Sequence, residues 1–241
     1  MQRGADLDAI STLVQHWRQL DLGAASRVHQ ADQAAMSGVS GFDLSATPYP
    51  YVGDILRADV WILMLNSNIG PDDQRQETEP YFAERLRANI TQNLDNYEYR
   101  MLSLDPKLEH TGTYAYYNHR NGLAKLVTAL AKRSRITEHE ARKQLASRLA
   151  VIQLFPYRST SGVPPELLSS VRSVQIARQA AREALNSKLV VVPRSAPQWG
   201  FCYGVREGNL FTFRADQARS ASLMPGGACG GGDAILERLL S

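Results

Sequence analysis

Residues 60–65 read VWILML, an unbroken apolar run that stops at the polar segment NSNIGPDD of residues 66–73. A short run of this kind is typical of a strand buried on both faces, as the strands of parallel sheets are. The pattern recurs at residues 151–155 (VIQLF) and 189–192 (LVVV), and proline and polar residues follow both runs. These three segments predict the centre of a parallel sheet, with a shorter fourth strand at residues 210–214.

Segments with helical spacing lie before, between and after these runs. Apolar residues recur every three or four positions in residues 7–20, and further helices are expected at residues 80–94, 117–150, 165–187 and 233–240. Strands that alternate with helices in this way are typical of an α/β domain.

The whole chain is therefore expected to form one domain. Over residues 1–241 we predict a three-layer α/β/α fold with a central, mostly parallel four-stranded sheet, and residues 1–45 are expected to form a helical N-terminal extension. Two side chains are expected to cap helices: Thr137, with Glu140 three positions later, and Asp233 at the start of the last helix.

The composition excludes several classes of protein. With 44% hydrophobic and 21% charged residues, the chain is neither collagen-like, coiled-coil nor wholly disordered. The longest apolar run is that at residues 60–65, against about 18 residues for a membrane-spanning helix, and residues 1–20 lack a secretory apolar region. The two cysteines are too few for a disulfide framework. We therefore expect a cytoplasmic protein with no membrane segment.

The histidines are scattered without metal-ligand spacing, and no nucleotide-binding motif such as a Walker A sequence is present. We accordingly expect neither a metal nor a cofactor. The net charge of +3 permits nucleic-acid binding without requiring it. Basic residues dominate residues 132–148 and 172–194, and these segments are either phosphate contacts or solvated helix faces.

Three polar loops follow the predicted strands, at residues 66–73, 156–162 and 193–199. Ligands of open α/β sheets bind beyond the carboxyl ends of the strands, so we expect these loops to converge on one crevice. The alternative is that they are ordinary turns, because turns also favour Asn, Ser, Gly and Pro.

Other candidate segments are assigned to the surface. The glycine-rich residues 226–232 are expected to be a flexible loop rather than a phosphate cradle, because no lysine or preceding strand accompanies them. His119 and Arg120 are expected to have a surface or capping role. Asp72 and Asp73 are expected to be solvated.

Several segments resemble a known family. Residues 48–54 (PYPYVGD) and 58–68 (ADVWILMLNSN) are similar to the first motif of the uracil-DNA glycosylase superfamily, in which an aromatic-flanked, proline-containing loop precedes a buried strand and its turn. Residues 154–159 (LFPYRS) and 191–195 (VVPRS) resemble the second and third strand ends, and residues 219–223 (RSASL) lie where the family has a His-Pro-Ser motif.

This resemblance implies a uracil-DNA glycosylase-like fold and hydrolysis of the N-glycosidic bond of a flipped base in DNA, or of a nucleotide. It implies that Asn66 orients the water, and that Arg194 or Arg219 stabilises the departing base in place of the family's histidine, since no histidine follows His139. The other residues expected to contact the substrate are Tyr51, Asn68, Tyr157, Ser159, Trp199, Arg219 and Ser220.

Two other interpretations of the sequence remain open. The same fold can bind a nucleic acid or nucleotide without cleaving it, since Ser67 and Asn68 replace the proline and glycine of the family's first motif. The fold can also serve an unrelated role, such as binding a protein partner. The enzyme reading predicts that Asn66→Ala folds but loses turnover, whereas the binding reading predicts salt-sensitive affinity for DNA without base release.

Overall fold

The structure is a computed structural model that describes residues 8–70 and 72–241. In these ranges the chain is an α/β protein with one mixed sheet of seven strands. The strands are β1 (Phe42–Asp43), β2 (Tyr51–Val52), β3 (Val60–Asn68), β4 (Leu149–Ser159), β5 (Leu189–Val192), β6 (Arg206–Glu207) and β7 (Leu210–Thr212).

The sheet has the order β1-β4-β3-β5-β7-β6, and β2 also pairs with β4. The four expected strands, β4, β3, β5 and β7, run parallel to one another. The prediction of a mostly parallel four-stranded sheet is nevertheless wrong, because β1, β2 and β6 pair antiparallel at the edges. Each of these edge strands is two residues long, too short to produce a period-2 pattern in the sequence.

Strand β4 continues past the point where the sequence predicts its end. The strand was expected to stop at Pro156, but it extends to Ser159. Pro156 has no N–H to donate, yet its carbonyl accepts a hydrogen bond from the Tyr49 amide at 2.9 Å, so the segment stays paired. Asn66 of β3 lies beside Phe155, and the extension of β4 places Ser159 beside Asn68 after a register shift.

The long helical segments are interrupted. The segment expected to be helical at residues 117–150 contains a π-helix, η4 (Tyr116–Arg120), then α6 (Leu123–Ser134) and α7 (Glu138–Arg148), with left-handed residues at Gly122 and Arg135 between them. Its last two residues are not helical, because β4 begins at Leu149. The remaining α-helices are α1 (Ala9–Arg18), α2 (Gln33–Met36), α3 (Asp73–Glu77), α4 (Pro80–Thr91), α5 (Gly112–Ala115), α8 (Pro165–Ser170), α9 (Arg172–Ala184), α10 (Ala196–Trp199) and α11 (Gly231–Leu240).

One of the two predicted caps is confirmed. Thr137 and Glu140 form a reciprocal capping box at the start of α7. Asp233 is not the cap of α11, because the helix begins earlier and Gly230 occupies the N-cap position. Instead, the Asp233 carboxylate accepts hydrogen bonds from the Gly226 amide at 3.0 Å, which fixes part of the glycine-rich loop.

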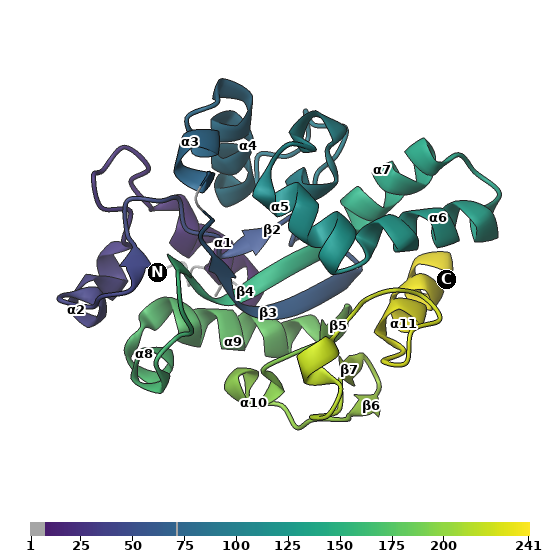
Figure 1. The fold of residues 1–241 in the computed structure, drawn as a ribbon. Coiled ribbons are helices and arrows are strands. Elements are labelled where there is room, and N and C mark those ends of the chain that lie inside the picture. Colours follow the sequence, from purple (N-terminus) through teal and green to yellow (C-terminus); the bar gives the residue numbers. More distant parts are fainter. Residues whose placement is uncertain (1–7, 71) are drawn as a thin grey trace, which may run out of the picture.

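Helices cover both faces of the sheet (Figure 1). Alternation along β3 sends Ile62 toward the core under α6, α7 and α11, and sends Trp61 toward the core under α1 and α9. The described part of residues 1–45 belongs to the same core as Trp61, since Trp17 is buried there and α1 packs on α9. Among the described residues, no helix has the length and apolar character that crossing a membrane requires.

Candidate functional site

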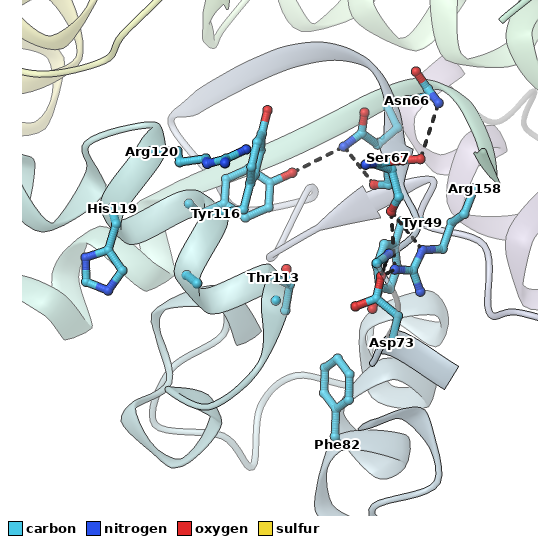
Figure 2. Close-up of a pocket in the computed structure, with 16 residues that line it drawn as sticks. Tyr49, Asn66, Ser67, Asp73, Phe82, Thr113, Tyr116, His119, Arg120 and Arg158 are labelled. Carbon is cyan, nitrogen blue, oxygen red and sulfur yellow. Dashed lines mark hydrogen bonds and ion pairs between the residues drawn. The ribbon is translucent and has the colours of Figure 1, made fainter. Parts of the chain in front are cut away.

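A cavity of about 490 Å³ opens at the carboxyl ends of β3 and β4. Figure 2 shows Tyr116 and Arg120 on one side of it, and Tyr49, Asp73 and Arg158 on the opposite side. Two of the three expected loops, at residues 66–73 and 156–162, contribute to its lining, but residues 193–199 do not. The opposite wall comes from residues 112–120, which the sequence did not assign to a site.

Gln153 is a buried amide in the cavity wall. It follows Leu149 and Val151 on the same face of β4, so strand alternation places it at the cavity rather than in the other core. Its Nε2 donates to Ser67 Oγ and to the Tyr117 hydroxyl, both at 3.2 Å. Gln153 is only 3% exposed, and its buried Oε1 has no hydrogen-bond partner among the described residues. An unpaired buried oxygen of this kind costs about 1–3 kcal/mol.

Four tyrosine and phenylalanine rings line the cavity. Tyr116 and Tyr117 lie in the π-helix with their rings edge to face at 5.1 Å between centroids, and Phe82 of α4 and Tyr49 add two more rings. Single π-turns occur frequently at functional sites. Burial raises the pKa of Tyr49 and of Tyr117 above the ordinary phenol value, so both hydroxyls stay protonated.

A buried cation closes one end of the cavity. Arg158, with a side chain 4% exposed, forms ion pairs with Asp73 and, at 2.5 Å, with Glu77. Its guanidinium also lies over the Tyr49 ring, 4.8 Å from the centroid, and donates to the Asn68 carbonyl at 3.3 Å. Charge-assisted pairs of this kind hold their groups in a fixed geometry.

The rim carries two exposed basic side chains, His119 and Arg120, which both line the opening. Neither forms an ion pair with a described residue. The expected surface location is therefore correct, and the structure adds that this surface is the mouth of the cavity. Asp72 is exposed as expected, but Asp73 is not a surface residue, since its side chain is only 15% exposed, lines the cavity and pairs with Arg158.

Three of the predicted site residues lie together at the end of β3. Asn66 and Asn68 line the cavity, and Ser159 is buried beside them. The Asn66 amide N–H groups donate to Ser159 Oγ at 2.7 Å and to the Ser67 carbonyl at 3.2 Å, so they tie β3 to β4. The described hydrogen bonds leave its Oδ1 free.

Three other predicted residues lie in the core on the opposite face of the sheet, where none lines the cavity. The Tyr51 hydroxyl donates to the Ile90 carbonyl at 2.6 Å, and the Tyr157 hydroxyl donates to Asp32 at 2.7 Å. Trp199 donates from its indole to the Met64 carbonyl at 3.2 Å. Tyr51 alternates to this face along β2, whereas along β4 the alternation breaks after Gln153, since Leu154 and Phe155 both lie in this core. The motif spacing therefore did not resolve the direction of Tyr157.

The two expected anion stabilisers also lie outside the cavity. Arg194 follows β5 and is exposed, and Arg219 and Ser220 lie exposed in a short helix, η5 (Ala218–Ser220). None of the three contributes to the cavity lining. In the part of the chain that the structure describes, no cluster of three or more His, Cys, Asp or Glu residues has the arrangement of a metal site.

No protein-family model, curated protein or solved structure matches this chain. The argument for function consequently rests on the cavity itself. Sequence reasoning missed the buried Gln153, although one signal was present: Gln153 is the single polar residue in the apolar run at 151–155. A buried polar side chain needs a partner, and such a position in a strand is a candidate for ligand contact.

Proposed function

We propose that the cavity binds a nucleobase and that the protein is a divergent uracil-DNA glycosylase-like hydrolase. The reaction is hydrolysis of the N-glycosidic bond between the base and its sugar, in DNA or in a nucleotide. The fold expected from the motif resemblance is part of this proposal.

The buried Gln153 amide is the observation that carries the proposal. Both groups that contact it, Ser67 Oγ and the Tyr117 hydroxyl, are hydroxyls that can either donate or accept. The amide can therefore turn over and present either its N–H₂ or its oxygen as the free end. A nucleobase edge offers paired donors and acceptors, and it would satisfy the amide end that has no partner in the structure.

The walls and size of the cavity suit a flat heterocycle. Aromatic side chains stack on bases at about 1–3 kcal/mol per base, and Tyr116, Tyr117 and Phe82 line the cavity. A volume of about 490 Å³ is within the range of about 300–1,000 Å³ for small-molecule sites. The cavity therefore has room for a base together with part of its sugar.

The basic side chains at the rim favour a substrate that carries a phosphate over a free base. His119 and Arg120 lie at the mouth, where the sugar and phosphate of a bound nucleotide would emerge. Contacts of this type position a nucleic acid without reading its sequence. The substrate class is therefore a nucleotide or a base flipped out of a DNA strand.

A base-release assay tests this function. Oligonucleotides that carry uracil, hypoxanthine, mismatched thymine or a modified cytosine would be incubated with the protein, and abasic sites would be detected by alkaline cleavage. We expect release from one substrate, lowered by about 100-fold in Gln153→Leu, because the departing base loses its buried hydrogen bond. Gln198→Leu, at an exposed glutamine, is the matched control.

Two results would overturn the hydrolase proposal. One is the absence of release from every substrate, and the other is undiminished release by Gln153→Leu.

Binding without cleavage is the second candidate function. The observation in its favour is that Arg194 and Arg219, the expected stabilisers of the departing base, both lie outside the cavity. This function predicts salt-sensitive oligonucleotide binding with no abasic product in the same assay.

A further inference from the structure

A second cavity, of about 340 Å³, lies between α6 and the glycine-rich segment that precedes α11. Helix α11 packs against α6, and Figure 1 shows the two helices next to each other. The lining consists of two groups of residues: Lys125, Thr128, Ala129 and Lys132 of α6, and residues 224–227. None of them lines the proposed nucleobase cavity. The two cavities are therefore separate sites.

Hydrogen bonds hold the loop side of this second cavity in place. The Leu223 amide donates to the Asn121 carbonyl at 3.0 Å, which ties the chain before the loop to the start of α6. The Gly226 amide donates to the carboxylate of Asp233 at 3.0 Å. The glycine-rich segment, which the sequence assigned to a flexible loop, is consequently fixed at the end that lines the cavity.

Two lysines give this cavity its charge. Lys125 and Lys132 are seven residues apart on α6, which is close to two helical turns, or about 10 Å, so both lie on the same face of the helix. Both are exposed, and the one lysine in a described ion pair is Lys143. No described lining residue is acidic. The carboxylate of Glu138, next to the lining, accepts a hydrogen bond from the Thr128 hydroxyl at 2.8 Å.

The other lining residues strengthen the attraction of the lysines for an anion. Ala129, Met224 and Pro225 are apolar, and apolar walls focus the field of cations that lie beside them. The sequence argued against a phosphate cradle at residues 226–232 because no lysine accompanies them. The fold supplies two lysines from α6 at this place.

From this arrangement we infer that the second cavity binds an anion with two linked phosphate groups, one for each lysine. Lysine binds phosphate as a point charge, and its flexible side chain lets Lys125 and Lys132 converge on such a ligand. Two sources have this chemistry: the diphosphate of a small molecule, and two successive phosphates of a nucleic-acid strand. The inference does not depend on the proposed hydrolysis.

The test is calorimetric titration with inorganic pyrophosphate in about 0.1 M salt, which screens charges more than about 10 Å away. The variant Lys125→Gln/Lys132→Gln removes the two cations of the cavity. The control Arg133→Gln/Arg135→Gln removes two exposed cations outside its lining, so the net charge of the two variants is the same. All the substituted residues are exposed, and the thermal unfolding temperature should be the same in all three proteins.

We expect the wild type to bind one equivalent of pyrophosphate. The lysine variant should bind it at least about tenfold more weakly, because two hydrogen bonds to charged groups are lost. The control should bind it within about threefold of wild type. Absence of binding by the wild type, equal affinity in the wild type and the lysine variant, or an equal loss in the two variants would overturn the site and leave the proposed function untouched.

Fluorescence anisotropy with a single-stranded oligonucleotide distinguishes the two sources of the phosphates. If the cavity holds a strand, pyrophosphate should displace the oligonucleotide, and the lysine variant should have a slope of log affinity against log salt reduced by about 1.4, for two phosphates. If the cavity holds a small molecule, the lysine variant should lose pyrophosphate binding and keep the oligonucleotide affinity of the wild type. Either result supports the site and identifies its ligand class.

Discussion

Arg158 is buried among groups from several parts of the chain. Asp73 and Glu77 pair with it from α3, the Tyr49 ring lies against it, and Glu77 also pairs with Arg27 at 3.4 Å. The network therefore joins the N-terminal segment to the cavity wall. A buried ion pair stabilises a protein little more than apolar side chains in both positions would. Removing only one partner, however, leaves the other charge buried without compensation and destabilises the protein.

Replacing Arg158 should consequently destabilise the protein strongly. We expect Arg158→Gln to lower the free energy of unfolding by about 3–5 kcal/mol, because Asp73 would remain largely buried without a cation and Glu77 would keep only Arg27. Urea unfolding followed by circular dichroism measures the change. Arg194→Gln, at an exposed arginine, should change it by less than about 0.5 kcal/mol. Equal stability of the two variants would contradict the importance of this network.

At the level of single residues, the sequence identified one end of the site and missed the other. Asn66 and Asn68 could be predicted, because polar residues directly after a buried strand lie at the carboxyl edge of a sheet. The contacts of Gln153 could not, since its partners Ser67 and Tyr117 are 86 and 36 positions away. Only the tertiary fold brings such residues together.

The elements differ in how clearly the sequence marks them. Strands β3, β4 and β5 were predictable because each contains a mostly apolar run of four to six residues. The edge strands β1, β2 and β6 were not, because their two residues pair only once β4 or β7 is in place. The break between η4 and α6 occurs at Gly122, whose φ of 86° is left-handed, a backbone conformation that apolar periodicity does not reveal.

Helix α11 packs closely against the segment before it. A Cβ atom at Gly232 would lie 2.3 Å from the Leu223 carbonyl oxygen, which is too close for any side chain without a backbone shift. We expect Gly232→Ala to lower the free energy of unfolding by at least about 2 kcal/mol, measured by urea or thermal unfolding.

The control is Gly162→Ala, where a Cβ atom meets nothing within 4 Å. It should change the free energy of unfolding by less than about 1 kcal/mol. A Gly232→Ala protein as stable as this control would show that α11 is free to move away from the chain at Leu223.

Across the whole molecule, a buried polar network fastens the N-terminal segment to the sheet. Asp32 accepts hydrogen bonds from the Tyr157 hydroxyl and from the Ser173 hydroxyl and amide. His16 contacts Ser173 Oγ at 2.8 Å and stacks on His29 with ring centroids 3.6 Å apart. Two stacked imidazoles in this position are compatible with burial only while both remain neutral.

The network predicts a loss of stability in acid. Burial, with a further contribution from His29, lowers the pKa of His16 from 6.5 to about 4, and burial also lowers the pKa of His29. Below pH 6.5 the unfolded chain therefore binds protons that the folded chain does not, so the free energy of unfolding falls as the pH falls toward 4. Above pH 6.5 these groups contribute no pH dependence.

Urea unfolding between pH 4 and pH 7 measures this effect. His16→Gln removes one of the two titrating groups, and we expect it to reduce the acid loss by roughly 1–3 kcal/mol relative to wild type. An identical pH dependence in wild type and variant would contradict a neutral His16 in the folded state.

The charge on the rim predicts salt-dependent binding of nucleic acid. If Arg120 contacts one phosphate, Arg120→Gln should reduce the slope of log affinity against log salt by about 0.7 for a single-stranded oligonucleotide. Fluorescence anisotropy at several salt concentrations provides the slope. Arg194→Gln should leave it unchanged, because Arg194 lies outside the cavity. A reduced slope in Arg194→Gln together with an unchanged slope in Arg120→Gln would instead place the phosphate contact at the residues after β5.

The nucleobase site itself can be tested by calorimetric titration of the wild type and Gln153→Leu with uracil, hypoxanthine, thymine and cytosine. A site formed by the Gln153 amide and the aromatic walls predicts one equivalent of one of these bases bound by the wild type, and binding at least about tenfold weaker in Gln153→Leu. Absence of binding for all four bases, or equal affinity in the two proteins, would contradict it.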